Sequence, residues 1–210
     1  PSSAASDVYK RQEHPHTLQS MNNLGALYKS QGRYDLAEPL DVKSLELSKK
    51  VLGVEHPDTL RAMNNLGALY KSQGRYEEAE PLYIKSLALR EKVLGAEHPD
   101  TLISRNDLAS LYESLGRYDL AEPLYVKSLE LSEKVLGVEH PSTLIYMNNL
   151  ALLYSNQGRY DLAEPLYVKG LSLNKKMFGL EHPYTLQSMN NLAGLYRRQA
   201  VSYTHLRAHE

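Results

Sequence analysis

Histidine and carboxylate side chains stand next to each other at regular intervals in this 210-residue chain, and such pairs can bind a metal ion or move a proton. The pairs belong to five Glu-His-Pro elements spaced 42 residues apart, which begin at Glu13, Glu55, Glu97, Glu139 and Glu181. A metal ion needs its ligands at about 2 Å, whereas packed helices lie about 10 Å apart, so equivalent histidines cannot share one ion. We therefore expect a structural role at the turn between repeats, and no metal site, for His14, His56, His98, His140 and His182.

The other polar residues also give no sign of catalysis. They recur in every copy, as scaffold residues do, whereas an active site requires one unrepeated arrangement. The phosphate-binding patterns GxGxxG and GxxxxGK[ST] are absent. We expect no enzyme activity and no cofactor.

The composition limits which cellular compartment and which binding partners we expect for this protein. The chain has 24 basic and 25 acidic side chains, a formal charge of −1, so no whole-chain charge favours nucleic acid or an anionic membrane. A recurring tyrosine could stack on bases, but without a basic excess we expect core packing instead. There is no cysteine, no apolar run long enough to span a bilayer and no signal-peptide pattern, so we expect a cytoplasmic protein without membrane contact.

The spacing of 42 residues divides the chain into copies, and such self-similarity is typical of a solenoid. Four full copies cover 13–54, 55–96, 97–138 and 139–180, and a half copy covers 181–199. The flanks 1–12 and 200–210 do not follow the pattern. They look like translated sequencing-adaptor tails, so we expect non-native or disordered segments there, with genuine divergent tails as the alternative.

Each copy contains the signals of two helices. In the second copy Pro57 suits a first helical turn, and apolar residues then recur at i, i+3, i+4 and i+7 until Gly74. A second apolar stripe runs from Tyr76 to Gly95, with Pro81 inside it. A short glycine turn between them predicts an antiparallel helix pair in each copy, and about nine helices in all.

These residues resemble the tetratricopeptide repeat, through Leu66, Gly67, Tyr70, Gly74 and Tyr83 among others. The length of 42 residues and the HPDTL and GRYEEAEPLY segments are similar to the repeats of kinesin light chains. The resemblance covers 13–199. It implies an all-α, right-handed superhelical solenoid and a concave groove lined by the first helices.

Positions 61, 64, 68 and 71 point away from the partner helix, and we call the equivalent positions of all copies the groove stripe. Its asparagines could hold an extended peptide through donor and acceptor groups, as the resemblance implies, or bridge adjacent helices. Its aliphatic residues indicate a contact surface, and its cations favour an acidic peptide with an apolar anchor. The alternative is that the aliphatic residues pack against neighbouring helices and the cations are solvated surface charge. The predicted groove residues are Asn22, Lys29, Arg61, Asn64, Lys71, Ile103, Asn106, Glu113, Ile145, Asn148, Leu152, Asn190 and Arg197.

We therefore expect a non-catalytic scaffold that binds a protein or peptide in this groove. The alternative is a sensor or oligomerisation segment of a larger signalling protein, such as an NTPase-type regulator. Because no polar capping helix is visible, the ends of the array are also expected to favour self-association.

Two copies depart from the pattern. In the third, Arg105 replaces a methionine and Asp107 an asparagine, and these two could form a local ion pair or give the groove its specificity. In the first, Asp41 replaces the tyrosine found at Tyr83. A carboxylate between helices lowers stability unless it reaches water, and we expect Asp41 to be exposed.

Overall fold

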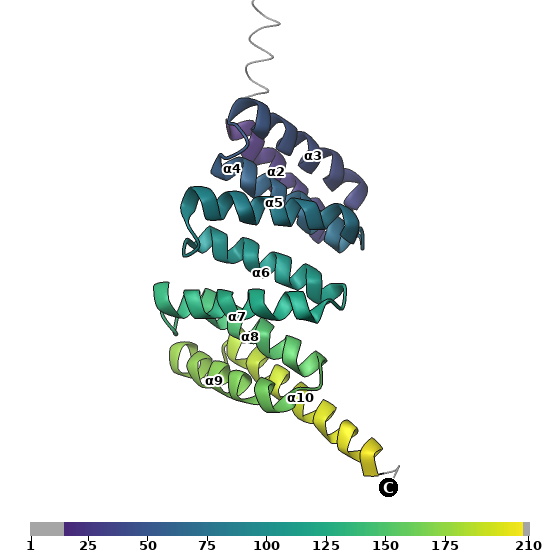
Figure 1. Cartoon of the computed structure of the whole chain (residues 1–210), viewed down its shortest axis with the longest axis vertical. Coiled ribbons are helices and arrows are strands. Elements are labelled where there is room, and N and C mark those ends of the chain that lie inside the picture. Colours follow the sequence, from purple (N-terminus) through teal and green to yellow (C-terminus); the bar gives the residue numbers. More distant parts are fainter. Residues whose placement is uncertain (1–14, 208–210) are drawn as a thin grey trace, which may run out of the picture. The chain divides into compact units, whose positions relative to one another are not determined.

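A computed structural model describes residues 15–207, and the residues it describes form nine helices and no strand. The predicted flank 1–12 and His14 lie outside these residues. Figure 1 shows the helices in chain order. Their bounds are α2 Pro15–Ser30, α3 Tyr34–Val51, α4 Pro57–Ser72, α5 Tyr76–Leu94, α6 Pro99–Ser114, α7 Tyr118–Val135, α8 Pro141–Asn156, α9 Tyr160–Phe178 and α10 Pro183–Arg207.

The predicted all-α fold of consecutive helix pairs is confirmed. The chain divides into two compact units, residues 1–111 and 112–210, and the boundary falls within α6. In unit 1, α2 packs on α3 and α4 on α5, and in unit 2, α8 packs on α9. Helix α10 follows the repeat pattern and then continues through residues 200–207, beyond the predicted end at 199.

The histidines cap the first helices. The Nδ1 atom of His56 accepts a hydrogen bond from the backbone N–H of Asp58 at 3.2 Å, and His140 does the same with Ser142 at 3.1 Å. This satisfies an amide that a helix start otherwise leaves unpaired. Thr59 completes the turn by donating to the carbonyl of Gly53 at 2.7 Å. The expected structural role at the turn between repeats is therefore confirmed for these histidines.

Glycines end the helices as predicted. Gly74, between α4 and α5, has φ +74°, and Gly95, after α5, has φ +89°. Residues with a side chain rarely adopt such backbone angles, which explains why glycine recurs at both turns.

An arginine after the first glycine turn connects successive copies. Arg75 lies over the ring of Tyr70, 4.2 Å from its centroid, and pairs with Glu38 of the preceding copy at 2.7 Å. In unit 2, Arg159 repeats this arrangement with Glu122 at 2.5 Å. The pairs are half-exposed, so they contribute little stability individually and mainly fix the register between copies.

The core is built from the repeating apolar positions. Tyr83 is almost fully buried against Gly67, where an added Cβ would come within 3.2 Å of the ring. The small residue on the first helix therefore makes room for the large ring on the second. Tyr125 and Tyr167 are buried in the same way in unit 2.

Asp41 corrects our expectation of exposure. It takes the place of Tyr83 in the first copy, but its side chain is only 3% exposed, beside Gly25. Its Oδ1 atom is buried without a hydrogen-bond partner. Burial raises the pKa of Asp41 from 3.8 to about 6, against the opposing effect of Lys29. The expectation failed because the helix pair α2–α3 encloses this position without help from a preceding copy.

Helix α2 leaves two leucines uncovered that are buried in later copies. Leu27 is 51% exposed, whereas its equivalent Leu69 is fully buried. Leu24 is likewise more exposed than Leu66. This is the kind of surface expected at the end of an array, and self-association through it stays a prediction.

Candidate functional site

The structure describes all the predicted groove residues, and those of each unit lie along its first helices. In unit 1 the apolar member is Ile103, which is 46% exposed on α6. In unit 2, Ile145 on α8 is 56% exposed and Leu152 is 37% exposed. These aliphatic side chains therefore face solvent, as a contact surface requires.

The asparagines of the stripe bridge neighbouring helices. Asn64 on α4 is only 7% exposed and donates to Ser104 at 3.1 Å and to Asp107 at 3.0 Å, both on α6. Asn22 on α2 accepts a hydrogen bond from Ser44 on α3 at 2.7 Å. The bridging role is thus present in unit 1, and it leaves Asn64 little surface for a ligand.

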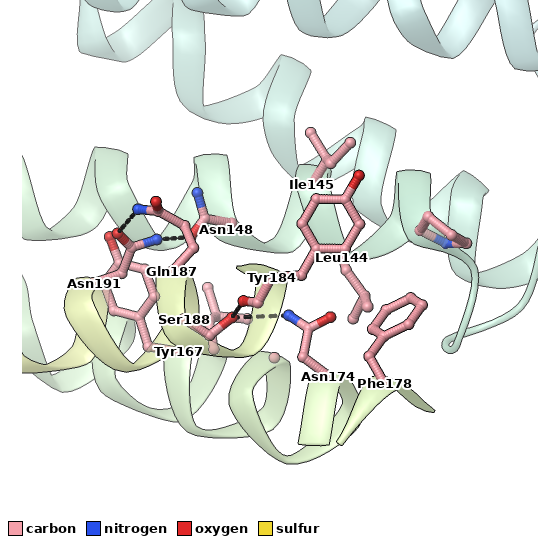
Figure 2. A pocket seen from close by; sticks show the side chains of 13 residues that line it. Leu144, Ile145, Asn148, Tyr167, Asn174, Phe178, Tyr184, Gln187, Ser188 and Asn191 are labelled. Carbon is pink, nitrogen blue, oxygen red and sulfur yellow. Dashed lines mark hydrogen bonds between the residues drawn. The ribbon is translucent and has the colours of Figure 1, made fainter. Parts of the chain in front are cut away.

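In unit 2 the stripe asparagine also bridges two helices but is less buried. Asn191 on α10 donates to the Oδ1 atom of Asn148 on α8 at 2.5 Å, and Gln187 donates to Asn191 at 2.8 Å. Asn148 is half-buried and Asn190 is exposed. Amide groups therefore remain at the surface here, and that of Asn148 lies about one helical turn from Ile145 on α8 (Figure 2).

Three charged members of the stripe have partners within the chain. Arg61 pairs with Asp58 at 2.7 Å, and Lys71 donates to Ser110 at 2.5 Å. Glu113 accepts from Tyr125 and from Asn156, both at 2.9 Å. The remaining members are Lys29, which is half-buried, Asn106, which is half-buried, and Arg197, which is exposed.

Arg105 pairs with a residue other than Asp107, so the ion pair that was one of the two expected possibilities is not formed. Its guanidinium is 5% exposed and pairs with Glu91 of α5 at 2.6 Å, while Asp107 accepts from Asn64. The equivalent residue Met63 is fully buried, so Arg105 occupies a core position. Arg105 therefore brings a charge into the core rather than into the groove.

Replacing Arg105 by methionine is expected to leave the free energy of unfolding unchanged or to raise it by about 1 kcal/mol, because an apolar side chain suits the position. Replacing Glu91 by alanine is expected to cost more, about 3 kcal/mol, because the buried guanidinium then lacks its charged partner and keeps only the carbonyl of Ala96 at 3.5 Å. Urea denaturation of both variants measures the two values. A larger loss for Arg105→Met than for Glu91→Ala would contradict this assignment.

A pocket of about 260 Å³ lies in unit 2 between α8, α9 and α10. Figure 2 shows Leu144, Ile145, Phe178 and Tyr184 toward one end, and Asn148, Gln187 and Asn191 toward the other. Tyr167 lies in its wall, and burial raises the pKa of this phenol to about 12. The full lining consists of Pro141, Leu144, Ile145, Asn148, Leu166, Tyr167, Gly170, Asn174, Phe178, Tyr184, Gln187, Ser188 and Asn191.

The groove stripe contains only three of these residues, Ile145, Asn148 and Gln187. On the second helices, the sequence pattern singled out Asp41 but none of the pocket residues. The signal was present there, since Gly170 and Asn174 replace Ser44 and Ser48 of the first copy. A comparison of every repeat position would have singled them out.

The described residues contain no cluster of three or more His, Asp or Glu side chains that could bind a metal ion. None of the helices in 15–207 is long and apolar enough to cross a membrane.

Solved structures with the same arrangement include kinesin light chain-like proteins. The chain is similar to the nearly identical TPR-like repeats of a candidate kinesin light chain from Podosopora anserina, with 29% identity, 92% of each chain covered and a TM-score of 0.78. A variant of that protein with one glutamine changed to methionine gives a TM-score of 0.79. BtubC (BKLC) from P. vanneervenii is 20% identical over 93% of this chain and 80% of its own, with a TM-score of 0.78, which shows the fold alone.

No curated protein matches the chain. The family model described as "Tetratricopeptide repeat" matches residues 16–83, 64–125, 106–176 and 147–200. Such repeats generally act as non-catalytic scaffolds for protein–protein interaction. Together these matches extend over 16–200, and the chain belongs to the tetratricopeptide repeat family.

Proposed function

We propose that this chain is a non-catalytic, cytoplasmic interaction module that binds an extended peptide along the groove stripe. The observation that carries the proposal is in unit 2, where exposed aliphatic side chains lie beside surface amides. Ile145 is 56% exposed, and the Asn148 amide lies on the same face of α8. A peptide needs both, because its backbone requires donors and acceptors and its side chains require an apolar contact.

The polar groups of the stripe suit a peptide backbone better than a chemical reaction. The bridging hydrogen bonds of Asn148 and Asn191 fix the positions of the side chains before a ligand arrives. Preorganised side chains lose less conformational entropy on binding, which favours affinity. A short flexible peptide itself loses entropy when it is ordered, so we expect modest affinity for each segment.

Charge also suggests the type of peptide. Arg197 is exposed at one end of unit 2, while Arg61 is exposed in unit 1 although it pairs with Asp58. Cations near apolar positions favour a peptide with acidic residues flanking an apolar anchor. Some of these cations are already paired within the chain. We therefore expect the acidic residues of the peptide to affect the association rate more than the affinity.

A peptide array screened with the chain tests the proposal, with a variant in which Asn106 and Asn148 are both alanine. We expect the chain to select apolar peptides and the variant to lose at least about tenfold in affinity for them. The matched control is Asn23→Ala, an exposed asparagine on α2 outside the groove stripe, which should bind as the parent chain does. Equal binding by the double variant would refute the groove model.

A further inference from the structure

The pocket between α8, α9 and α10 exists because the fourth copy lacks a side chain that the other copies have. Ser44, Ser86 and Ser128 occupy the position of Gly170, and all three are fully buried. A Cβ added at Gly170 would meet only the Met147 sulfur, at 3.8 Å. The glycine therefore leaves open space in the interior of this helix layer.

The second copy shows how the same space is filled there. Ser86 donates to the carbonyl of Leu60 at 3.2 Å, and the buried Arg90 reaches the carbonyl of Asp100 at 2.6 Å. The equivalent of Arg90 in the fourth copy is Asn174, which donates to Ser188 at 2.8 Å, whereas the first and third copies have serine at this position. Only Gly170 is smaller than its equivalents in all the other copies, so the missing side chain there opens this pocket.

The lining of the pocket disfavours a charged ligand. None of its thirteen lining residues has a charged side chain. Its apolar end includes Phe178 and Tyr184, whose rings meet edge to face at 5.6 Å. An aromatic guest gains further from such rings, because offset and edge contacts between rings are favourable.

The other end of the pocket offers one donor and one acceptor. Gln187 donates to Asn191, which donates to the Oδ1 atom of Asn148. This series of two hydrogen bonds leaves the NH₂ group of Asn148 as a donor at one end. It leaves the Oε1 atom of Gln187 as an acceptor at the other end. A backbone carbonyl and a backbone N–H of a peptide complement these two groups.

The volume of the pocket suits a single side chain better than a larger ligand. Pockets for drug-sized molecules are usually about 300 to 1,000 Å³, and this pocket holds about 260 Å³. We propose that it is an anchor pocket for one uncharged aromatic side chain of a bound peptide, with the backbone of that residue held by Asn148 and Gln187. The inference rests on the proposed function and specifies which residue of the peptide the fourth and fifth copies select.

Gly170→Leu is expected to close the pocket without disturbing the fold. The added side chain enters the open space, and a helix gains stability when an interior glycine is replaced. We expect its melting temperature to equal or exceed that of the parent chain. Gly170→Ser, which restores the residue of the other copies, should fill the pocket only in part. Val168→Leu is the matched control, because Val168 is 46% exposed on α9 and does not line the pocket.

The probes are blocked amino acids, N-acetyl methylamides of phenylalanine, tryptophan, aspartate and lysine, titrated by NMR. We expect the aromatic probes to bind the parent chain and Val168→Leu with a dissociation constant of about 1 mM, and the charged probes much more weakly. Affinity for the aromatic probes should fall at least about tenfold in Gly170→Leu and less in Gly170→Ser.

Two results would overturn the inference: no binding of the aromatic probes to the parent chain, or undiminished binding to folded Gly170→Leu and Gly170→Ser. If array peptides still bind in that case, the groove stands and only the anchor pocket is refuted. If the aromatic probes bind as expected while no array peptide does, the pocket is supported and the proposed function fails.

Discussion

Asp41→Tyr is expected to raise the melting temperature of the chain by at least about 5 °C. The aspartate is 3% exposed, and one of its oxygens has no hydrogen-bond partner. Its ionised form is therefore held in a poorly solvated site, which costs stability at neutral pH. Tyrosine removes this cost and adds a large buried ring opposite Gly25, in the arrangement that Tyr83 and Gly67 already show.

The reciprocal variant provides the control. Tyr83→Asp places a carboxylate in the second copy at the same position and removes a buried ring, so we expect a loss of about 3 to 5 kcal/mol. Thermal denaturation followed by circular dichroism measures both variants. An unchanged or lower melting temperature for Asp41→Tyr would show that the first copy does not pack as the second copy does.

Stability is also expected to fall as the pH rises through the pKa of Asp41. The folded chain holds this proton more tightly than the unfolded chain, since the pKa rises from 3.8 to about 6 on burial. The contribution of the protonated group is fully present below pH 3.8 and is lost as the pH passes about 6. The whole shift corresponds to about 3 kcal/mol, the difference between a pH well below 3.8 and a pH well above 6.

Asp41→Asn isolates this effect, because an amide does not titrate in this range. The difference in free energy of unfolding between Asp41→Asn and the parent chain should grow by about 2 kcal/mol from pH 4 to pH 7. Urea denaturation at several pH values gives the difference, and titration of the other carboxylates cancels in it. A difference independent of pH would mean that Asp41 is solvated in the folded chain.

The helices and their ends could be predicted because each depends on local chemistry. Pro57 begins a helix where its missing N–H does no harm, and Gly74 ends it at an angle that few other residues adopt. These signals recur in each copy, so the helix bounds inferred for one copy predict those of the others. The burial of Asp41 could not be derived in this way, because it depends on how closely α2 and α3 approach each other.

The candidate site could be predicted only in part for the same reason. Helical periodicity placed Ile145 and Asn148 on one face of α8, but it could not show which amide bonds to which. The pocket depends on three helices and on a missing side chain at Gly170. Regular positions therefore predicted the fold, and departures from regularity produced the feature that distinguishes this chain.

Peptide binding in the groove stripe can be tested most directly through the isoleucines. The chain has three, and each gives a separate methyl signal: Ile84, Ile103 and Ile145. The latter two belong to the groove stripe, whereas Ile84 lies on α5 and is 45% exposed, which makes it an internal control. We predict that the strongest array peptide shifts the methyl signal of Ile145, with or without that of Ile103, and leaves Ile84 unchanged. A shift confined to Ile84, or no shift at saturating peptide, would contradict peptide binding in the groove stripe.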